Sequence, residues 1–298
     1  MIEDRSRKKA VYVTMANTLN RATHNLTLIE RRILMIAISK LGNKKYTGNP
    51  SVKVTALEIA EHAGITPEAA YVSAIAADKQ LYNRSIPILY DLVTGERKKG
   101  RTRWITTSYY ASGEGYIEVS INNELLPYLT ELKREFTAYN HARTGGFRSI
   151  YSCRLFDRIM QWKNEGKLQI TVEELADCLE APKSLRANFA NLRNRAIEPA
   201  IKEIKEKDGL SIKWKPLRKK GRKVTALEFT FPPEQQKALP LQKPKKRKPP
   251  PKPQLTEEQQ IQAENTAALA HYKKMAELSG VPIDEILPNE LKATLTPS

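Results

Sequence analysis

The hydrophobic residues between positions 26 and 41 recur every three to four residues, which is the period of an α-helix. Four of them share one face: Leu26, Ile29, Ile33 and Ile36. The same period turns the charged triplet of Glu30, Arg31 and Arg32 away from that face. We therefore expect an amphipathic helix that begins after Asn25, ends near Leu41 and presents the triplet to solvent.

Two helix-start signals follow in close succession. The segment Thr55-Ala-Leu-Glu58 is a capping box, in which the threonine hydroxyl accepts from a helical N–H and the glutamate side chain accepts from the threonine N–H. It predicts a short helix over residues 56–62, which a glycine ends. Thr66 and Pro67 suit the N-cap and first position of a second helix over residues 67–83. Two helices joined by a short glycine-containing turn predict a helix-turn-helix.

Segments rich in β-branched and aromatic residues come next and predict three strands, over residues 86–90, 102–110 and 116–121. The last two are joined by Ser112-Gly-Glu-Gly115, which predicts a hairpin turn. Residues 125–132 then favour a helix. A helix-turn-helix followed by a β-hairpin is the order of elements in a winged helix.

The same order begins again after Ser149. Residues 150–162 predict an amphipathic helix, with Leu155, Ile159 and Trp162 on one side and Arg154, Asp157 and Arg158 on the other. A second capping box, Thr171 to Glu174, opens "TVEELAD", which aligns with "TALEIAE" at 55. A longer helix is expected from about Ser184, with these residues inward: Leu185, Phe189, Leu192, Ala196 and Ala200. Alternation then predicts two strands, one with Leu210, Ile212 and Trp214 and the other with Leu227, Phe229 and Phe231.

The pentamer "RKKGR" occurs twice, at 97–101 and at 218–222. We expect the first copy in the loop that enters the middle strand and the second between the last two strands. Because capping box, helix pair, strands and basic loop recur in one order, the chain is interpreted as two tandem winged-helix domains of α+β class. The expected divisions are residues 1–140 for dimerisation and DNA backbone contacts, residues 141–232 as the main DNA-reading domain, and residues 233–298 as a linker and helical tail.

Charge sets the class of partner. Lys and Arg number 50 against 33 Asp and Glu, so the formal net charge is +17, which favours a nucleic acid or an anionic membrane surface. The longest apolar runs, such as residues 33–38, are too short to span a membrane, and the N-terminus lacks the apolar core of a signal peptide. A soluble, cytoplasmic protein is expected. The stretch "PLQKPKKRKPPPKPQ" predicts an extended linker, and residues 256–279 a marginal helix.

The sequence contains few of the motifs that indicate an enzyme. The Gly-x-x-x-x-Gly-Lys-Ser/Thr loop of ATPases is absent from the sequence. A nicking relaxase needs clustered histidines beside a tyrosine, whereas His24, His62, His141 and His271 are isolated. Cys153 and Cys178 are not spaced as a disulfide framework or zinc site. We expect no catalytic activity, no cofactor and no metal.

Candidate DNA contacts come from both repeats. Arginine pairs with guanine O6 and N7, and asparagine with adenine N6 and N7, when a helix lies in the major groove. The second recognition helix supplies Lys183, Ser184, Arg186, Asn188, Asn191, Arg193, Asn194 and Arg195, with Arg193 at the edge of its buried face. Phosphate contacts are expected from Arg218, Lys219, Lys220, Arg222 and Lys223 in the second wing, and from Arg84, Arg97, Lys98, Lys99 and Arg101 in the first repeat.

Several segments resemble the replication initiator (Rep) proteins of iteron-containing theta-replicating plasmids such as the F factor. They are "LTLIERRILMIAI" and "YIEVSINNELLPYLTELKREFTAY" in the first repeat, and "SIYSCRLFDRIMQW", "NLRNRAIEPAIKEI" and "LSIKWKPLRKKGRKVTALEFTF" in the second. Where the family has a basic run in its second recognition helix, this chain has Arg193-Asn194-Arg195, so the central position offers no guanidinium.

The resemblance implies two winged helices on double-stranded, directly repeated origin DNA. It also implies a homodimer that represses its own gene, a monomer that starts replication, and host partners: the initiator ATPase, the replicative helicase and chaperones. The alternative from the residues alone is a tandem winged-helix transcription regulator without a role in replication.

Overall fold

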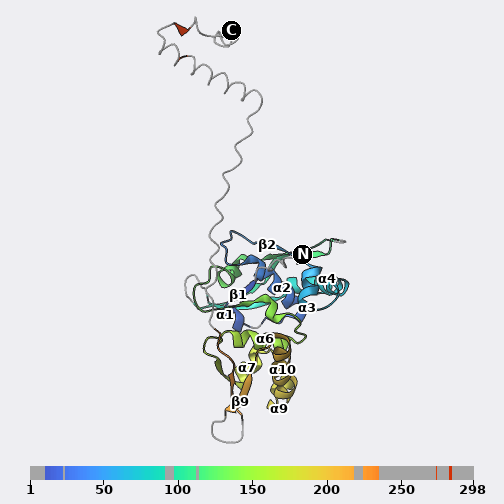
Figure 1. Ribbon diagram of the computed structural model, residues 1–298, viewed down its shortest axis with the longest axis vertical. Helices are drawn as coiled ribbons and strands as arrows, with labels where there is room; N and C mark the ends of the chain where they lie inside the picture. The colour runs from blue at the N-terminus through green and yellow to red at the C-terminus, as the bar shows by residue number, and fades with distance from the viewer. Residues whose placement is uncertain are drawn as a thin grey trace, which may run out of the picture. The chain divides into compact units, whose positions relative to one another are not determined.

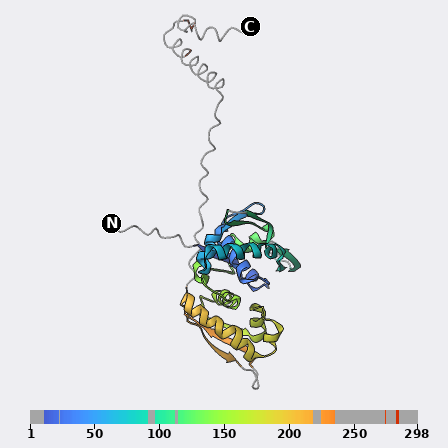
Figure 2. The same cartoon turned by 90° about the vertical axis from the view of Figure 1, so that its right-hand side faces the viewer.

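The computed structural model describes residues 11–22, 24–90, 97–111, 114–217 and 224–234, with positions 273, 282 and 283. The chain divides into two compact units, Met1–Gln242 and Lys243–Ser298. All the helices and strands below lie in the first unit, which contains two winged helices (Figures 1 and 2). The expected α+β tandem winged-helix fold is confirmed.

The first winged helix has three helices and a three-stranded antiparallel sheet. Its elements are α2 (Leu28–Leu41), β2 (Ser51–Thr55), α3 (Ala56–Ala63), α4 (Pro67–Asn83), β5 (Ile105–Ala111) and β6 (Tyr116–Ile121), with sheet order β2-β6-β5. Thr55 and Glu58 form the expected capping box, and Thr66 caps α4 with Pro67 in its first turn. Strand β2 was not expected from the sequence.

Further elements surround this unit. Strands β1 (Tyr12–Ala16) and β7 (Phe136–Asn140) form a separate antiparallel pair, and α1 (Asn17–Arg21) follows β1. Strands β3 (Ser85–Tyr90) and β4 (Arg97–Arg103) form another. The helix expected over residues 125–132 is shorter, with a 3-10 turn η1 (Asn123–Leu125) and one turn of α5 (Leu126–Leu129). A 3-10 turn η2 (His141–Thr144) leads towards the second winged helix.

The first RKKGR was placed wrongly. It forms the start of β4, which pairs with β3 in its own hairpin, instead of a loop. The single strand expected over residues 102–110 is two strands, β4 and β5, which break at the fully buried Trp104. The first basic pentamer therefore lies outside the three-stranded sheet of its winged helix.

The second winged helix comprises α6 (Ile150–Met160), β8 (Lys167–Thr171), α7 (Val172–Cys178), α8 (Lys183–Arg186), α9 (Phe189–Leu192), a π-turn η3 (Arg193–Ile197), α10 (Glu198–Asp208), β9 (Lys213–Leu217) and β10 (Ala226–Thr230). Its sheet order is β8-β10-β9. The helix expected to run unbroken from Ser184 is interrupted, because Asn188 leaves helical geometry and caps a new turn at Ala190. The π-turn ends where Pro199, which has no N–H to donate, enters α10.

The internal repeat is real at the level of hydrogen bonds. Thr55 and Thr171 each end a five-residue strand and cap the next helix. The first helical N–H then donates to the residue that precedes the central strand, Ala56 to Gly115 at 2.7 Å and Val172 to Thr225 at 3.0 Å. In the sequence the second RKKGR lies between β9 and β10, which corresponds to the segment between β5 and β6 in the first repeat, so the two pentamers are not equivalent.

The charged triplet in α2 does not face solvent. Glu30, Arg31 and Arg32 are only 0%, 4% and 8% exposed. Arg154 of α6, also expected outside, is 8% exposed. For Arg31, Arg32 and Arg154 the expectation was wrong because the outer faces of α2 and α6 meet the other repeat and the connecting segment. Glu30 is buried within its own repeat, where it accepts from Arg84 at the end of α4.

Candidate nucleic-acid interface

The recognition segment of the second winged helix runs from α8 to η3. Leu185, Leu192 and Ala196 are buried and fix it to the domain core. The expected reading residues Lys183, Ser184, Arg186, Asn188, Asn191, Asn194 and Arg195 are exposed, and Arg193 is half-buried at the edge. The polar side chains therefore share the solvent face of this segment, as a helix in a major groove requires.

Two of these residues also hold the segment together. Arg186 donates from Nε to Ala181 O at 2.6 Å and from Nη2 to Ala176 O at 3.0 Å, and it forms an ion pair with Asp177. These bonds tie α8 to the end of α7. Asn188 accepts from the Ala190 N–H at 2.8 Å and so starts α9. Their contact with DNA stays a prediction, beside a structural role that the structure assigns.

The η3 residues carry the groups best suited to base reading. Arg193 Nε donates to Asn194 Oδ1 at 2.9 Å and lies 3.6 Å from Glu198 Oε1, which holds its guanidinium along the helix. Arg195 is exposed on the same turn. A π-turn widens the backbone and shifts the side chains after it, so it sets the direction of Arg195 relative to Asn191.

The wing follows β9. Arg218, Lys219, Lys220, Arg222 and Lys223 lie outside the described residues. In the sheet, Glu228 of the central strand β10 contacts Lys167 at 2.8 Å and Lys215 at 2.9 Å, and these contacts hold the pKa of Glu228 down at about 2. A fixed negative charge between two exposed lysines limits the positive potential of this face of the sheet.

The first repeat places its basic residues differently. Arg84 donates from Nε to both carboxylate oxygens of the fully buried Glu30, at 3.1 and 3.0 Å, so it anchors the end of α4 to α2. Arg101 is exposed on β4 and donates to Ser85 Oγ at 3.0 Å. Strand β4 begins with Arg97, Lys98 and Lys99, and the structure describes only the backbone of these three residues.

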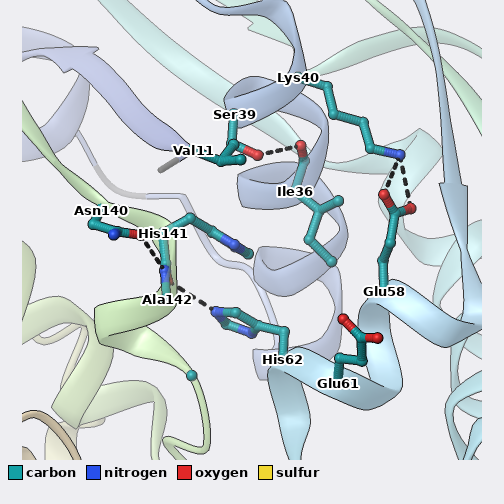
Figure 3. A pocket seen from close by; sticks show the side chains of 11 residues that line it. Val11, Ile36, Ser39, Lys40, Glu58, Glu61, His62, Asn140, His141 and Ala142 are labelled. Carbon is teal, nitrogen blue, oxygen red and sulfur yellow. Dashed lines mark hydrogen bonds and ion pairs between the residues drawn. The ribbon is translucent and has the colours of Figure 1, made fainter. Parts of the chain in front are cut away.

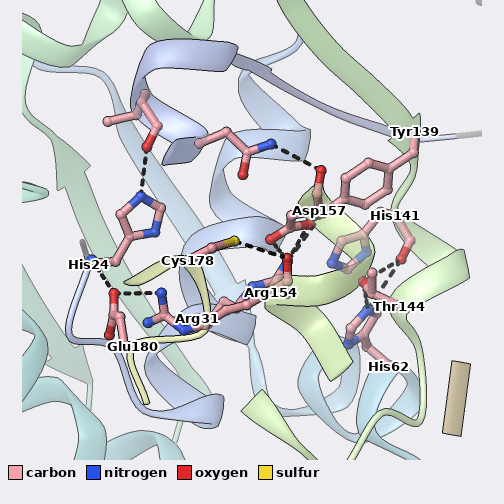
Figure 4. A network of polar contacts seen from close by, with 12 residues as sticks. His24, Arg31, His62, Tyr139, His141, Thr144, Arg154, Asp157, Cys178 and Glu180 are labelled. Atoms are coloured by element: carbon pink, nitrogen blue, oxygen red, sulfur yellow. Dashed lines mark hydrogen bonds and ion pairs between the residues drawn. The ribbon is translucent and has the colours of Figure 1, made fainter. Parts of the chain in front are cut away.

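A buried ion pair and several hydrogen bonds join the two winged helices (Figure 4). Arg31 of α2 contacts both carboxylate oxygens of Asp157 of α6, at 2.9 and 2.7 Å. The Tyr139 hydroxyl donates to Asp157 Oδ1 at 2.7 Å. Burial, and after it the charge of Asp157, raises the pKa of Tyr139 well above its usual value. The Arg32 guanidinium donates to Phe147 O in the connecting segment.

Glu180 makes a second link across the same boundary. Its carboxylate accepts from the His24 N–H at 2.5 Å and the Asn25 N–H at 3.1 Å in the first repeat. It also pairs with Arg154 of its own repeat at 2.5 Å. The α2–α6 boundary is thus held by charged groups from three separate chain segments, which fixes one relative arrangement of the two winged helices.

A stacked histidine pair lines a cavity at the same connection (Figure 3). The His62 and His141 rings lie 4.0 Å apart, centroid to centroid, and His62 Nε2 lies 3.2 Å from His141 O. The cavity has a volume of about 540 Å³ and is also lined by Lys40 and Glu58. Burial lowers the pKa of His62 to about 4 and that of His141 to about 3, so both rings are neutral at pH 7. Because the rings are nearly parallel, their nitrogen lone pairs cannot converge on one ion.

Other site types gain no support from the described part of the chain. It contains no group of three or more His, Cys, Asp or Glu side chains that could hold a metal ion. None of its helices is long and apolar enough to cross a membrane. Cys153 and Cys178 are free thiols, and burial raises the pKa of Cys178 to about 11, so neither suits a reactive role.

The residues that join the repeats were missed from sequence. The only signal was the triplet Glu30-Arg31-Arg32 inside an otherwise apolar run, together with Asp157 and Arg154 on one face of the matching helix. Charged faces at the same place in both repeats are expected when the two faces are buried against each other. It was interpreted as a solvated face because each helix was considered alone.

Comparison with known proteins adds the family. Residues 12–160 match the model "Initiator Replication protein, WH1" and residues 171–231 match "Initiator Rep protein, WH2". The chain is 24% identical over 227 residues to a "Replication initiation protein" of Escherichia coli, covering 73% of this chain and 68% of that protein. It is 25% identical over 221 residues to an "Uncharacterized 27.6 kDa protein" of Escherichia coli, covering 71% of this chain and 92% of that protein.

Among solved structures, "Crystal structure of Pi initiator protein in complex with iteron DNA" matches with a TM-score of 0.66 at 24% identity, over 77% of this chain and all of that one. That likeness supports the fold. The two family models together span the paired winged helices described above, one for each repeat. The chain therefore belongs to the family of plasmid replication initiator (Rep) proteins.

Proposed function

We propose that the protein initiates replication of a plasmid by binding directly repeated DNA, or iterons, in the replication origin. The observation that carries the proposal is the pair of equivalent helix-turn-helix units in a chain of net charge +17, fixed to each other by the buried Arg31–Asp157 ion pair and by the hydrogen bonds of Glu180. The Pi initiator, which has this fold, was solved with iteron DNA. The protein acts in the bacterial cytoplasm on double-stranded DNA and catalyses no reaction itself.

The domains divide the work. Residues 141–232 read the bases through Asn191, Asn194 and Arg195, while residues 1–140 grip the backbone through Arg101 and the β3–β4 hairpin. The second wing, with Arg218, Lys219, Lys220, Arg222 and Lys223, adds phosphate contacts. Residues 233–298 contribute nonspecific affinity through their basic, proline-rich part.

Footprinting on the DNA that flanks the gene tests this proposal. The expected result is protection of several direct repeats next to an A·T-rich segment. A plasmid whose only replication source is this gene with that DNA then separates the initiator from the alternative, a transcription regulator without a replication role. Protection without replication of that plasmid would favour the regulator.

The helix and wing roles are separable by salt titration. Arg195→Ala should cost about 1 to 3 kcal/mol on the cognate site and relax discrimination at one base pair. Replacing Lys219 and Lys220 with alanine should weaken cognate and random duplexes alike and lower the salt slope by up to about two units, if both contact phosphate. Equal weakening of cognate, single-variant and random duplexes by Arg195→Ala would contradict the reading role.

A homodimer is the proposed repressor of the protein's own promoter, and a monomer the active initiator. Strand β5 lies at the edge of the sheet order β2-β6-β5, and an edge strand can pair with a second copy. Tyr109 on this strand is 64% exposed, and α5 follows the neighbouring β6. Sedimentation should show concentration-dependent dimers. A chain that is monomeric at every concentration and still represses would refute the dimer.

Host proteins complete the proposal: an initiator ATPase, the replicative helicase and chaperones. The sequence has no phosphate-binding loop, so the energy of helicase loading must come from another protein. Permanganate reactivity of unpaired thymines in the origin should appear with this protein and rise when the host ATPase is added.

A further inference from the structure

The exposed face of α4 carries no charge along most of its length. Between Glu68 and Asp78 the sequence is AAYVSAIAA, without a single ionisable acid or base other than Tyr71. In a chain of which 28% of residues are charged, two and a half turns of surface helix without charge are unusual. Helix α4 lies at the outside of the first winged helix (Figure 1).

Helical geometry defines the stripe. Ala70, Ala74, Ala77 and Leu81 are buried and form one face of α4. Val72 lies opposite that face, because it is about two residues out of phase with Ala70 and Ala74 at 3.6 residues per turn. Val72 is 66% exposed, and Ala69 and Ala76 on either side of it are also exposed. We call Ala69, Val72 and Ala76 the α4 stripe.

The second repeat shows what an equivalent face looks like when it is polar. Matching buried Ala77 and Leu81 with buried Ala196 and Ala200 places Ala76 where Arg195 stands. One turn earlier, the same match places Val72 where the second repeat has Asn191. The same frame thus presents methyl groups in one repeat and hydrogen-bonding groups in the other.

Charged groups flank the stripe and argue for DNA as its occupant. Lys79 is exposed one turn beyond Ala76 on the same side of the helix. The Arg103 guanidinium lies 4.8 Å from the Tyr82 ring centroid at the end of α4. Of the two acidic groups, Asp78 accepts from the Ser108 hydroxyl, and Glu68 is exposed in the first turn. A basic end beside an apolar face suits a groove bordered by phosphates.

We propose that the α4 stripe, with Val72 at its centre, reads thymine methyl groups in the major groove of the segment bound by the first winged helix. The thymine C5-methyl is the apolar feature of that groove, and small aliphatic side chains are its complement. This inference rests on the proposed DNA-binding function. It makes the first winged helix a reader of A·T pairs, beyond a backbone anchor.

Deoxyuridine tests the idea directly because it lacks only the methyl group. Thymines in the half of the footprint protected by the first winged helix are replaced by deoxyuridine, one at a time and together. Each contacted methyl should contribute roughly fourfold in affinity, the factor that corresponds to burying one such group. Val72→Ala should weaken the thymine duplex similarly and become insensitive to deoxyuridine.

Two control variants keep the test specific. Arg195→Ala, in the other repeat, should retain the full deoxyuridine effect. Val11→Ala removes the same side-chain atoms from another exposed valine, 45% exposed, and should change nothing. Alanine is favourable in a helix, so Val72→Ala keeps α4 intact, and its unfolding midpoint checks this.

The outcomes separate the two levels of the proposal. Absence of specific binding to any duplex would remove the proposed function itself. Specific binding with no deoxyuridine effect at any position would overturn only the reading role of α4. If Val72→Ala instead changes the sedimentation of the protein while its deoxyuridine response stays that of the wild type, the stripe binds protein and the inference is wrong.

Discussion

Glu180 occupies a backbone conformation that favours glycine, and replacing it tests how the two winged helices are joined. Its φ is 49°, in the left-handed region. The equivalent residue in the first repeat is Gly64, with φ 66°, and both follow helices that end with the same bond, Ile65 N to Ala60 O and Ala181 N to Ala176 O. A side chain at such a position costs about 1 to 2 kcal/mol.

The carboxylate contacts offset that strain. Glu180 is 13% exposed in its pair with Arg154, 8% exposed, and it accepts from the His24 and Asn25 N–H groups. Removing one partner of a buried pair costs about 3 to 5 kcal/mol. Glu180→Gly removes the pair and relieves the strain, so we expect the free energy of unfolding to fall by roughly 1 to 4 kcal/mol, the difference between these two effects.

Alanine variants separate the two contributions. Glu180→Ala loses the same contacts but keeps a Cβ, so it should be about 1 kcal/mol less stable than Glu180→Gly. Gly64→Ala, with nothing within 4 Å of its new Cβ, should show the strain alone, also about 1 kcal/mol.

Guanidinium unfolding followed by tryptophan fluorescence is the assay. Trp104 is fully buried and meets the His24 ring edge-on at 5.1 Å, next to the Glu180 contact. Glu180→Gly as stable as the wild type would show that the carboxylate contacts contribute nothing beyond the strain. Equal stability of Glu180→Ala and Glu180→Gly would refute the strain.

Three further predictions concern pH, the tail and spacing. The pKa values of His24 and His62 are lowered by burial to about 4 and that of His141 to about 3, so the unfolded chain binds more protons between about pH 3 and 6.5. The free energy of unfolding should therefore be highest above about pH 7 and fall as pH drops through that window. Measured by urea unfolding, His62→Phe should reduce the slope of this free energy against pH by up to about 1.4 kcal/mol per pH unit. A truncation after Gln242, which keeps the 2.8 Å pair of Glu234 with Arg143, should leave the footprint unchanged and weaken binding modestly; a shifted footprint would place reading residues in the tail. Inserting one base pair between the two protected segments moves them apart by about 3.4 Å and rotates them. Because the buried Arg31–Asp157 pair and the Glu180 hydrogen bonds hold the two winged helices together, we expect affinity to fall at least about tenfold in a gel-shift titration. Unchanged affinity would mean that the two winged helices move independently.

Local signals in the sequence predicted what local interactions determine. Helix α4 begins and ends where Thr66, Pro67 and Asn83 indicated, and both threonine capping boxes form. Strands β1, β2, β7 and β8 were missed, because each is five residues long and gains its partner from a distant segment. Asn188 broke the second recognition helix since its side chain competes for a backbone N–H, which helical periodicity alone does not reveal.

In the candidate site, too, the sequence predicted features that depend on local pattern and missed those that depend on distant partners. The exposed polar residues of α8 to η3 could be predicted, because a recognition helix must be polar on one side only. Arg186 could not be separated from them, since its partners Ala176 and Ala181 accept through backbone oxygens that no residue pattern marks. The repeated RKKGR led to a wrong placement of its first copy for a related reason. In a lysine-rich chain the same short basic sequence can occur twice at positions that are not structurally equivalent.

The charged residues at the boundary between the winged helices determine how the two domains are arranged more than how tightly they are held together. Replacing a buried ion pair with apolar residues of similar volume is often neutral or stabilising. Apolar residues in place of Arg31 and Asp157 could therefore stabilise the boundary equally well. Their hydrogen bonds, together with that of Tyr139, are satisfied in one arrangement, whereas an apolar boundary would tolerate sliding. Under the proposed function, both recognition helices contact adjacent segments of one DNA duplex. A fixed arrangement then favours binding, because the spacing of the proposed reading residues is set before binding and ordering them adds no entropic cost.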